Sequence, residues 1–337
     1  RNFANKIWNA SRFALMNLAG FDPDRFVDLL QENQGEGNQN QGKASLALVD
    51  RWILARLQRT IGEVNDSLES FRINDAAQAI YRFIWSELCD WYIELVKSDL
   101  YADGGQGTEP ESAAQRRRLA QGTLAHVLEA ALRLLHPFMP FVTEEIWQQL
   151  PKPTGAAGSI MVTLYPSPDR GLVDDEAEAQ MNLVMDVAVA IRGIRAEYRV
   201  PPAEKVRAIV SISDDARRCA LAESAALVER AARASLEIVA SSAGCARLAA
   251  KMIVGGDVEV LVPLEGIVDV AAERARLVKD AGKVEKDIQI SSRKLENPAF
   301  VERAPADVVE NERARLEELR ARLVKLEEAR RALQTEA

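Results

Sequence analysis

The strongest constraint on the fold of this 337-residue chain is a pair of heptad repeats separated by a proline-bounded break. The first repeat places apolar or small residues at a and d positions over residues 277–295, and the second does so over residues 309–333. Between them lies ENPAFVERAP (296–305), with a proline near each end. Because proline interrupts helices, the pattern predicts an antiparallel coiled-coil hairpin over residues 269–337.

The predicted hairpin is less acidic than the rest of the chain. Residues 270–337 contain 15 Lys or Arg against 14 Asp or Glu, whereas the whole chain has a net charge of −8. Two helices of about 28 residues would extend about 40 Å at 1.5 Å per residue. Such a hairpin buries little of its own surface, so we expect it to pack on the body or to reach out to a partner.

Residues 1–202 are predicted to form a helical bundle. Residues 33–45 are rich in Gly, Asn and Gln and are expected to form a flexible loop. Ile160–Leu164 could form a strand, and Asn74 or Asp75 is expected to cap a helix. Apolar residues at spacings of three and four predict helices at about 1–19, 46–68, 73–102, 112–136 and 175–199.

Residues 203–268 have a different pattern, which predicts a small α+β module. Val206–Ser213 alternates apolar and polar residues like a strand, and Ala216–Ala234 is rich in alanine and reads as a helix. Leu236–Val239 and Val258–Pro263 are two further candidate strands. The predicted fold class is therefore mainly α, with a helical bundle, a small α+β module and a coiled-coil hairpin.

No catalytic constellation is evident in the sequence. The phosphate-loop, dinucleotide-binding and HExxH metalloprotease patterns do not occur. The chain has 3 cysteines, too scattered for a zinc module, and 2 histidines. No apolar stretch suggests a membrane span or a signal peptide. We therefore predict no catalytic residue and no metal site within this chain, and expect it to bind rather than to react.

The first helix carries cations, amides and an aromatic ring, a combination that suits recognition of single-stranded bases. Such bases are read by stacking and by hydrogen bonds to their edges. For Trp8 and Phe21, packing in the core is the alternative interpretation. We predict that the base-reading surface comprises Arg1, Asn5, Trp8, Asn9, Arg12 and Phe21.

A second candidate surface is an arginine stripe. Arg192, Arg195 and Arg199 recur at i, i+3 and i+7, which places them on one helix face. Like charges four residues apart cost a few tenths of a kcal/mol, roughly, in an isolated helix. The stripe favours an anionic partner, with a simple solvated face as the alternative.

Several segments resemble class I valyl-tRNA synthetases, and together they cover nearly the whole chain. RNFANKIWNASRF (1–13) is similar to the segment that follows the catalytic domain in that family. IRGIRAEYRVPP (191–202) matches a later helix, and LENPAFVERAPADVVENERARL (295–316) resembles the tip of the family's C-terminal arm. Three further segments resemble helices of the family's anticodon-binding domain: DRWILARL (50–57), FRINDAAQAIYRFIWSELCDWYIELVK (71–97) and LLHPFMPFVTEEIWQQL (134–150).

The resemblance implies the C-terminal portion of a bacterial enzyme that joins valine to tRNA(Val) with ATP. The family's HIGH and KMSKS motifs and its editing domain are not in this chain, so ATP and Mg would be held by a catalytic domain outside it. By itself the chain is expected to be inactive, monomeric and cytoplasmic. Its implied partners are tRNA(Val) and the catalytic domain of the same polypeptide.

The resemblance also implies that the helical bundle surrounds the anticodon and that the hairpin lies against the outer corner of the tRNA. Cations near the hairpin tip could then follow the RNA backbone. The candidates on the hairpin are Lys283, Lys286, Arg293, Lys294 and Arg303.

Two alternative interpretations remain open from the sequence. Several of the motifs are shared with isoleucyl and leucyl enzymes, although the heptad ending and the lack of a cysteine zinc module favour the valyl family. The other alternative is a non-enzymatic scaffold with a coiled-coil dimerisation arm. The proline-containing break argues for a hairpin within one chain instead.

Overall fold

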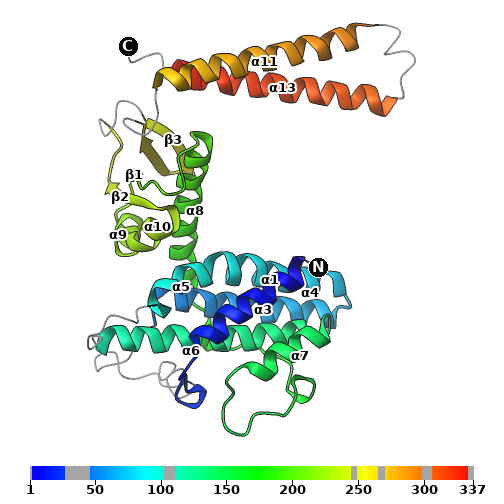
Figure 1. Cartoon of the computed structure of the whole chain (residues 1–337), viewed down its shortest axis with the longest axis vertical. Coiled ribbons are helices and arrows are strands. Elements are labelled where there is room, and N and C mark those ends of the chain that lie inside the picture. The colour runs from blue at the N-terminus through cyan, green and yellow to red at the C-terminus, as the bar shows by residue number, and fades with distance from the viewer. Residues whose placement is uncertain are drawn as a thin grey trace. The chain divides into compact units, whose positions relative to one another are not determined.

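The computed structural model describes residues 2–26, 46–101, 111–243, 249–264, 270–297 and 306–332 (Figure 1). The chain divides into two compact units, Arg1–Met185 and Asp186–Ala337. Within the described residues, every strand belongs to one four-stranded sheet, in the second unit. No described helix combines the length and the apolar character that crossing a membrane requires.

The first unit is a helical bundle built around α3, which packs against α4, η1 and α6. Its largest fully buried side chains include Trp52, Phe83, Tyr92 and Trp147. Its elements are α1 (Asn2–Asn17), α3 (Leu48–Glu69), α4 (Ile73–Arg82), η1 (Phe83–Tyr92), α5 (Ile93–Leu100), α6 (Glu111–Leu135), α7 (Pro140–Gln149), η2 (Ile160–Val162) and η3 (Arg170–Leu172).

The helices expected from apolar periodicity are present with small shifts of their ends. The helix predicted at residues 73–102 runs through α4, η1 and α5, and its central part, Phe83–Tyr92, is a π-helix. The cap prediction was wrong, because Arg72 is the N-cap residue of α4 and makes no side-chain capping hydrogen bond. The expected loop at residues 33–45 lies outside the described residues.

The strand expected at Ile160–Leu164 was also wrong. The hydroxyl of Ser159 accepts a hydrogen bond from the N–H of Met161 (3.2 Å) and starts the single 3₁₀ turn η2. This turn packs beside α7, and the sheet of the second unit does not include it. An apolar run without a strand partner thus forms a turn, although its side chains have strand-like composition.

A buried pair of polar groups joins α3 to η1 inside the bundle. The phenolic O–H of Tyr92 donates to Oδ1 of Asp50 (2.7 Å), and both side chains are buried. Burial raises the pKa of Asp50 to about 7, and the hydrogen bond from Tyr92 acts against that shift. The bundle core therefore contains a carboxyl group whose ionisation opposes folding near neutral pH.

An ion-pair network also links α3 to its neighbours. Arg56 donates to both carboxylate oxygens of Glu87 (2.9 and 3.0 Å) and to Glu178 (3.0 Å). The two bonds to Glu87 form a bidentate pair, the strong geometry for a guanidinium and a carboxylate. Arg59 pairs with the same Glu178 and with Asp175. These pairs join the start of α8 (Asp175–Glu197) to α3, with Glu178 largely covered and Asp175 exposed.

The second unit contains the predicted α+β module. Its sheet has the order β2-β1-β4-β3, with β1 parallel to β2 and antiparallel to β4. The predicted helix 216–234 is two helices that meet at Ser224, and the strand β3 was not predicted. The module comprises β1 (Val206–Ile212), α9 (Asp215–Glu223), α10 (Ala225–Ala232), β2 (Ala234–Val239), β3 (Ala249–Val254) and β4 (Val258–Pro263).

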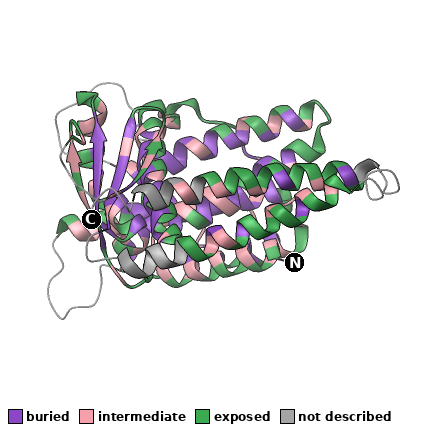
Figure 2. Cartoon of the chain, turned by 90° about the horizontal axis from the view of Figure 1, so that it is seen from above, coloured by how far each residue is buried: buried purple, intermediate pink, exposed green. Residues whose placement is uncertain are grey.

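The predicted hairpin is formed by α11 (Val270–Glu296) and α13 (Ala306–Ala332), which pack against each other. Figure 2 shows the central strands β1 and β4 largely buried, whereas the hairpin helices are mostly exposed. The side chains at Leu277, Leu326 and Leu333 lie outside the described ones. The seam buries Ala281, Val284, Ser291, Val309 and Leu316, all at predicted heptad positions.

Candidate nucleic-acid interface

The exposed face of α1 brings together most of the predicted base-reading residues. Ile7, Ser11 and Ala14 are buried on the opposite face of the helix. Trp8 is 39% exposed, so the protein covers part of its side chain and leaves the rest open to solvent. The residues that share the exposed face are Asn5, Trp8, Asn9 and Arg12.

The other two residues of the predicted base-reading surface are Phe21 and Arg1. Phe21 is half-buried and meets Phe26 edge-on, with ring centroids 6.2 Å apart. Because Phe26 is buried against Gly122, Phe21 covers an apolar part of the bundle. Arg1 lies outside the described residues.

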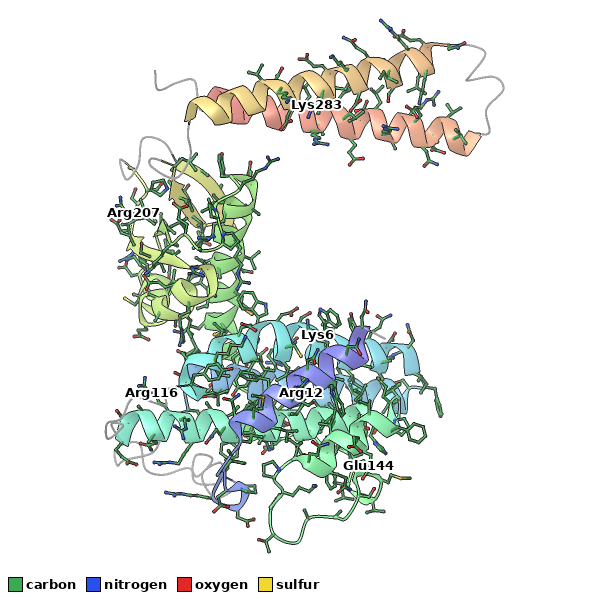
Figure 3. All side chains as sticks on the ribbon, viewed as in Figure 1. Lys6, Arg12, Arg116, Glu144, Arg207 and Lys283 are labelled. Carbon is green, nitrogen blue, oxygen red and sulfur yellow. The ribbon has the colours of Figure 1, made fainter. Side chains whose placement is uncertain are left out.

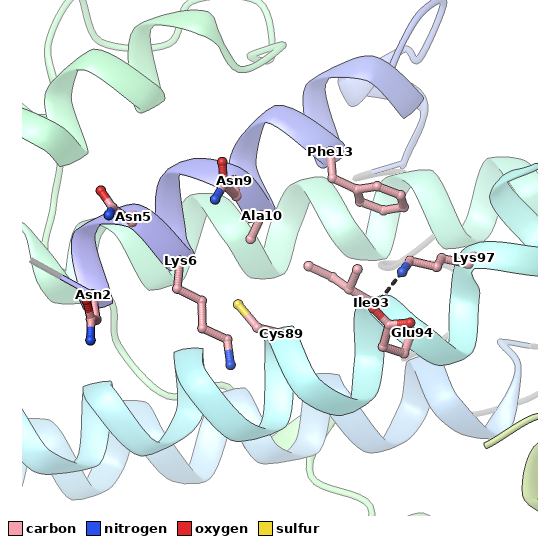
Figure 4. Close-up of a pocket in the computed structure, with 10 residues that line it drawn as sticks. All are labelled: Asn2, Asn5, Lys6, Asn9, Ala10, Phe13, Cys89, Ile93, Glu94 and Lys97. Carbon is pink, nitrogen blue, oxygen red and sulfur yellow. Dashed lines mark hydrogen bonds and ion pairs between the residues drawn. The ribbon is translucent and has the colours of Figure 1, made fainter. Parts of the chain in front are cut away.

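A hollow of about 490 Å³ lies beside the exposed face of α1. Asn5 and Asn9 line it from α1, together with Lys6, and Lys97 lines it from α5 (Figure 4). The amides offer both donors and acceptors, and Glu94 lines the hollow beside the two lysines. The sequence analysis missed Lys6 and Lys97 because their part of the site depends on how α1 packs against η1 and α5.

Both lysines in this hollow are held by neighbouring groups. Lys6 Nζ lies 2.5 Å from a carboxylate oxygen of Asp90 and 3.8 Å from the centroid of the Trp85 ring. Lys97 pairs with Glu94 at 2.6 Å. Their positions are thus fixed, while Arg12 projects from the same helix as a further exposed cation (Figure 3).

The hollow does not have the chemistry of a catalytic centre. Cys89 lines it, but burial raises the pKa of its thiol to about 11, which keeps the sulfur protonated at neutral pH. Within the described part of the chain, no group of three or more His, Cys, Asp or Glu residues could hold a metal ion.

The predicted arginine stripe on α8 is divided by the fold. Arg195 is 8% exposed and donates to the carbonyl oxygens of Glu204 (2.8 Å), Pro201 (3.1 Å) and Arg233 (3.1 Å). Arg192 is exposed and its Nε donates to the carbonyl of Ala231 (2.9 Å). A continuous exposed stripe was therefore the wrong geometry, because converging carbonyls draw the middle arginine inward.

The cations of the hairpin also differ among themselves. Lys294 lies 3.7 Å from Glu312 and so links α11 to α13, and Lys283 lies 3.6 Å from Asp280 on its own helix. Lys286 and Arg293 are exposed, whereas Arg303 lies outside the described residues. Figure 3 marks the position of Lys283 on α11. Arg293 and Lys286 are thus the best placed of this set to meet a phosphate.

Comparisons with known families match two separate parts of the chain. Residues 50–210 match the anticodon-binding domain of tRNA ligases. Residues 269–334 match the valyl tRNA synthetase tRNA-binding arm. The two matches coincide with most of the helical bundle and with the hairpin.

Three of the similar proteins carry the same name. The valine–tRNA ligase of Geobacter sulfurreducens is 49% identical over 95% of this chain, and that of Syntrophotalea carbinolica is 40% identical over 96% of it. The valine–tRNA ligase of Geobacillus stearothermophilus is 38% identical over 93% of the chain. The chain spans 33% of the length of the first two relatives and 32% of the third. The chain is therefore similar to about a third of the length of valine–tRNA ligases, and it contains regions that match an anticodon-binding domain of tRNA ligases and a valyl tRNA synthetase tRNA-binding arm.

Proposed function

We propose that this chain is the tRNA-holding portion of a valine–tRNA ligase, with tRNA(Val) as its RNA partner. The observation that carries the proposal is the pair of family matches in separate regions, each described by binding to tRNA. Joining valine to tRNA with ATP would be the activity of the longer protein. A catalytic domain of the same polypeptide would supply it, together with ATP and Mg.

The exposed face of α1 and the hollow beside it are the proposed contact for anticodon bases. Asn5 and Asn9 can pair with base edges, and Trp8 offers an exposed ring for stacking. Arg12 adds a guanidinium that can bond a base or a phosphate. Because these groups lie on one helix face, they can act on neighbouring nucleotides.

The hairpin is the proposed contact for RNA outside the anticodon, at the outer corner of the tRNA; the match to a tRNA-binding arm supports this proposal. Its exposed cations Lys286 and Arg293 would contact the backbone, which carries no sequence information. Such contacts would set orientation and add salt-dependent affinity.

We further propose that the protein is a cytoplasmic monomer. The scaffold alternative requires the coiled coil to pair between chains, yet α11 and α13 bury their heptad residues against each other. The described heptad residues that are buried in this seam are therefore not available for pairing with a second chain. A monomer mass that does not change with concentration in analytical ultracentrifugation would support this proposal. A dimer would contradict it and favour the scaffold alternative.

The direct test is binding of the 337-residue chain to purified tRNA(Val) at two salt concentrations. A tRNA(Ala) and a tRNA(Val) with a swapped anticodon serve as controls. We expect tighter binding to tRNA(Val), weakened by salt, and no activation of valine by ATP. Equal affinity for all three RNAs would contradict an anticodon-reading role.

A further inference from the structure

A second hollow, of about 380 Å³, lies in the second unit where two helices end. It is lined by the end of α8, by the Pro201–Pro202 turn and by the end of α10. Among the residues that the structure describes, no carboxylate lines it. Four arginines do, namely Arg192, Arg195, Arg199 and Arg233.

Two of these arginines have backbone conformations that arginine rarely adopts. Arg199 has φ 52° and Arg233 has φ 53°, and both are exposed. Glycine and asparagine are the usual residues where the backbone becomes left-handed at the end of an α-helix. Only Phe71 shares a positive φ among the other described non-glycine residues. Strained backbone conformations are common at functional sites. We therefore expect the two arginines at these helix ends to have a functional role.

The other two arginines build the hollow. Arg195 joins the two helix ends, because its guanidinium bonds the carbonyls of Pro201 and Glu204 after α8 and that of Arg233 after α10. Arg192 reaches across to the carbonyl of Ala231 in α10. These bonds hold Arg199 and Arg233 at one opening, although 34 residues separate them in the sequence.

We propose that Arg199 and Arg233, with Arg192 beside them, bind a phosphate group at this opening. Guanidinium groups bond phosphate oxygens in pairs, and several of them around one site match its charge. The assignment of that phosphate to an RNA backbone rests on the proposed function. A free polyphosphate would offer the same chemistry, and the test separates the two sources.

A competing explanation is helix capping alone. Helix C-termini carry partial negative charge, and cations there stabilise the helix without any ligand. Glycine distinguishes the two explanations, because it relieves the left-handed backbone and removes the charge in one step. If the arginines serve only as caps, their replacement by glycine leaves phosphate binding unchanged, whatever its effect on stability.

The experiment compares the chain with its Arg199→Gly, Arg233→Gly and double variants. Lys205→Ala is the matched control, since Lys205 is an exposed cation in the same unit and does not line the hollow. For the double variant we expect an unchanged or raised melting temperature and about tenfold weaker tRNA binding, with a salt slope lower by about 1–2. Lys205→Ala should bind nearly as the parent chain does.

A second arm of the experiment uses inorganic tripolyphosphate and no RNA. It should raise the melting temperature of the parent chain more than that of the double variant. Unchanged tRNA affinity with a retained difference in tripolyphosphate response would overturn the RNA assignment and support a free-phosphate site. No difference in either arm would overturn the phosphate site itself. If the parent chain binds no tRNA, the proposed function fails, and tripolyphosphate alone decides the inference.

Discussion

The helical bundle and the hairpin are both made of long helices, yet they are held together in different ways. The bundle surrounds α3 on several sides and buries Trp52, Phe83 and Tyr92 completely. The hairpin has one seam, which buries small or medium side chains and includes the hydroxyl of Ser291. A thick core can fix individual groups for base reading, whereas a thin seam fixes a shape and a spacing of charges.

The largest test of this comparison applies one substitution to both regions. Leu54→Ala in the bundle should lower the free energy of unfolding by about 3 kcal/mol or more, because its cavity is enclosed on all sides. Leu316→Ala in the hairpin should cost only about 1–2 kcal/mol, because the seam can collapse and adjoins solvent. Denaturant unfolding followed by circular dichroism measures both, and equal costs would refute the contrast.

A second prediction concerns the buried Asp50. Its folded pKa of about 7 lies above its usual value of 3.8, so the folded state binds more protons and stability falls as pH rises between these values. Asp50→Asn keeps an oxygen that can accept from Tyr92 but cannot ionise. At pH 8 we expect it to raise the free energy of unfolding by about 2 kcal/mol, on the order of a linkage shift of this size.

Melting curves between pH 5 and pH 8 check this prediction. The parent chain should lose stability over that interval, and the variant should lose less. A variant that is less stable than the parent at pH 8 would show that the ionised carboxylate helps to fold the bundle.

A third prediction contrasts the two RNA-binding regions. Arg12→Ala should weaken binding of tRNA(Val) by about 1–2 kcal/mol. It should also reduce the difference in affinity between tRNA(Val) and the anticodon-swapped tRNA. Lys286→Ala with Arg293→Ala should weaken the binding of both RNAs equally and lower the salt slope. Filter binding at several salt concentrations measures these effects. Equal loss for both RNAs in the Arg12 variant would remove that residue from base reading.

The smallest effect is expected from Glu312 in the hairpin. Ser291 and Lys294 lower its pKa below the usual value, so its contribution to stability is present above that value and is lost as pH falls through the folded pKa. Because the pair with Lys294 is long at 3.7 Å and partly exposed, Glu312→Gln should cost less than about 1 kcal/mol at pH 7. A larger loss, seen by thermal unfolding at pH 7, would mean that the seam depends on this charge.

Periodicity predicted the long helices well because their apolar faces repeat over many turns. The same repeat predicted the hairpin, in which Val284 and Leu316 are buried as the heptads require. Short segments gave less information. Ile160–Leu164 has the composition of a strand but no strand beside it, and Ala249–Val254 becomes a strand through pairing with β4.

The site could be predicted only where it lies on one helix. The exposed face of α1 follows from helical spacing alone, and Asn5, Asn9 and Arg12 were found that way. The inward direction of Arg195 depends on carbonyls that the fold brings together from positions 201, 204 and 233. Arg233 reaches the same hollow because the chain crosses over between the parallel strands β1 and β2. Helical spacing in the sequence cannot predict that contact.

The central claim is that this chain holds tRNA through an anticodon-dependent bundle and an anticodon-independent arm. The most direct measurement is the affinity of the parent chain, the Arg12→Ala variant and the Lys286→Ala/Arg293→Ala variant for tRNA(Val) and its anticodon-swapped form. The account predicts that the bundle variant loses discrimination between the two RNAs and that the arm variant loses affinity while keeping discrimination. Well-folded proteins that show no discrimination in any form would contradict it.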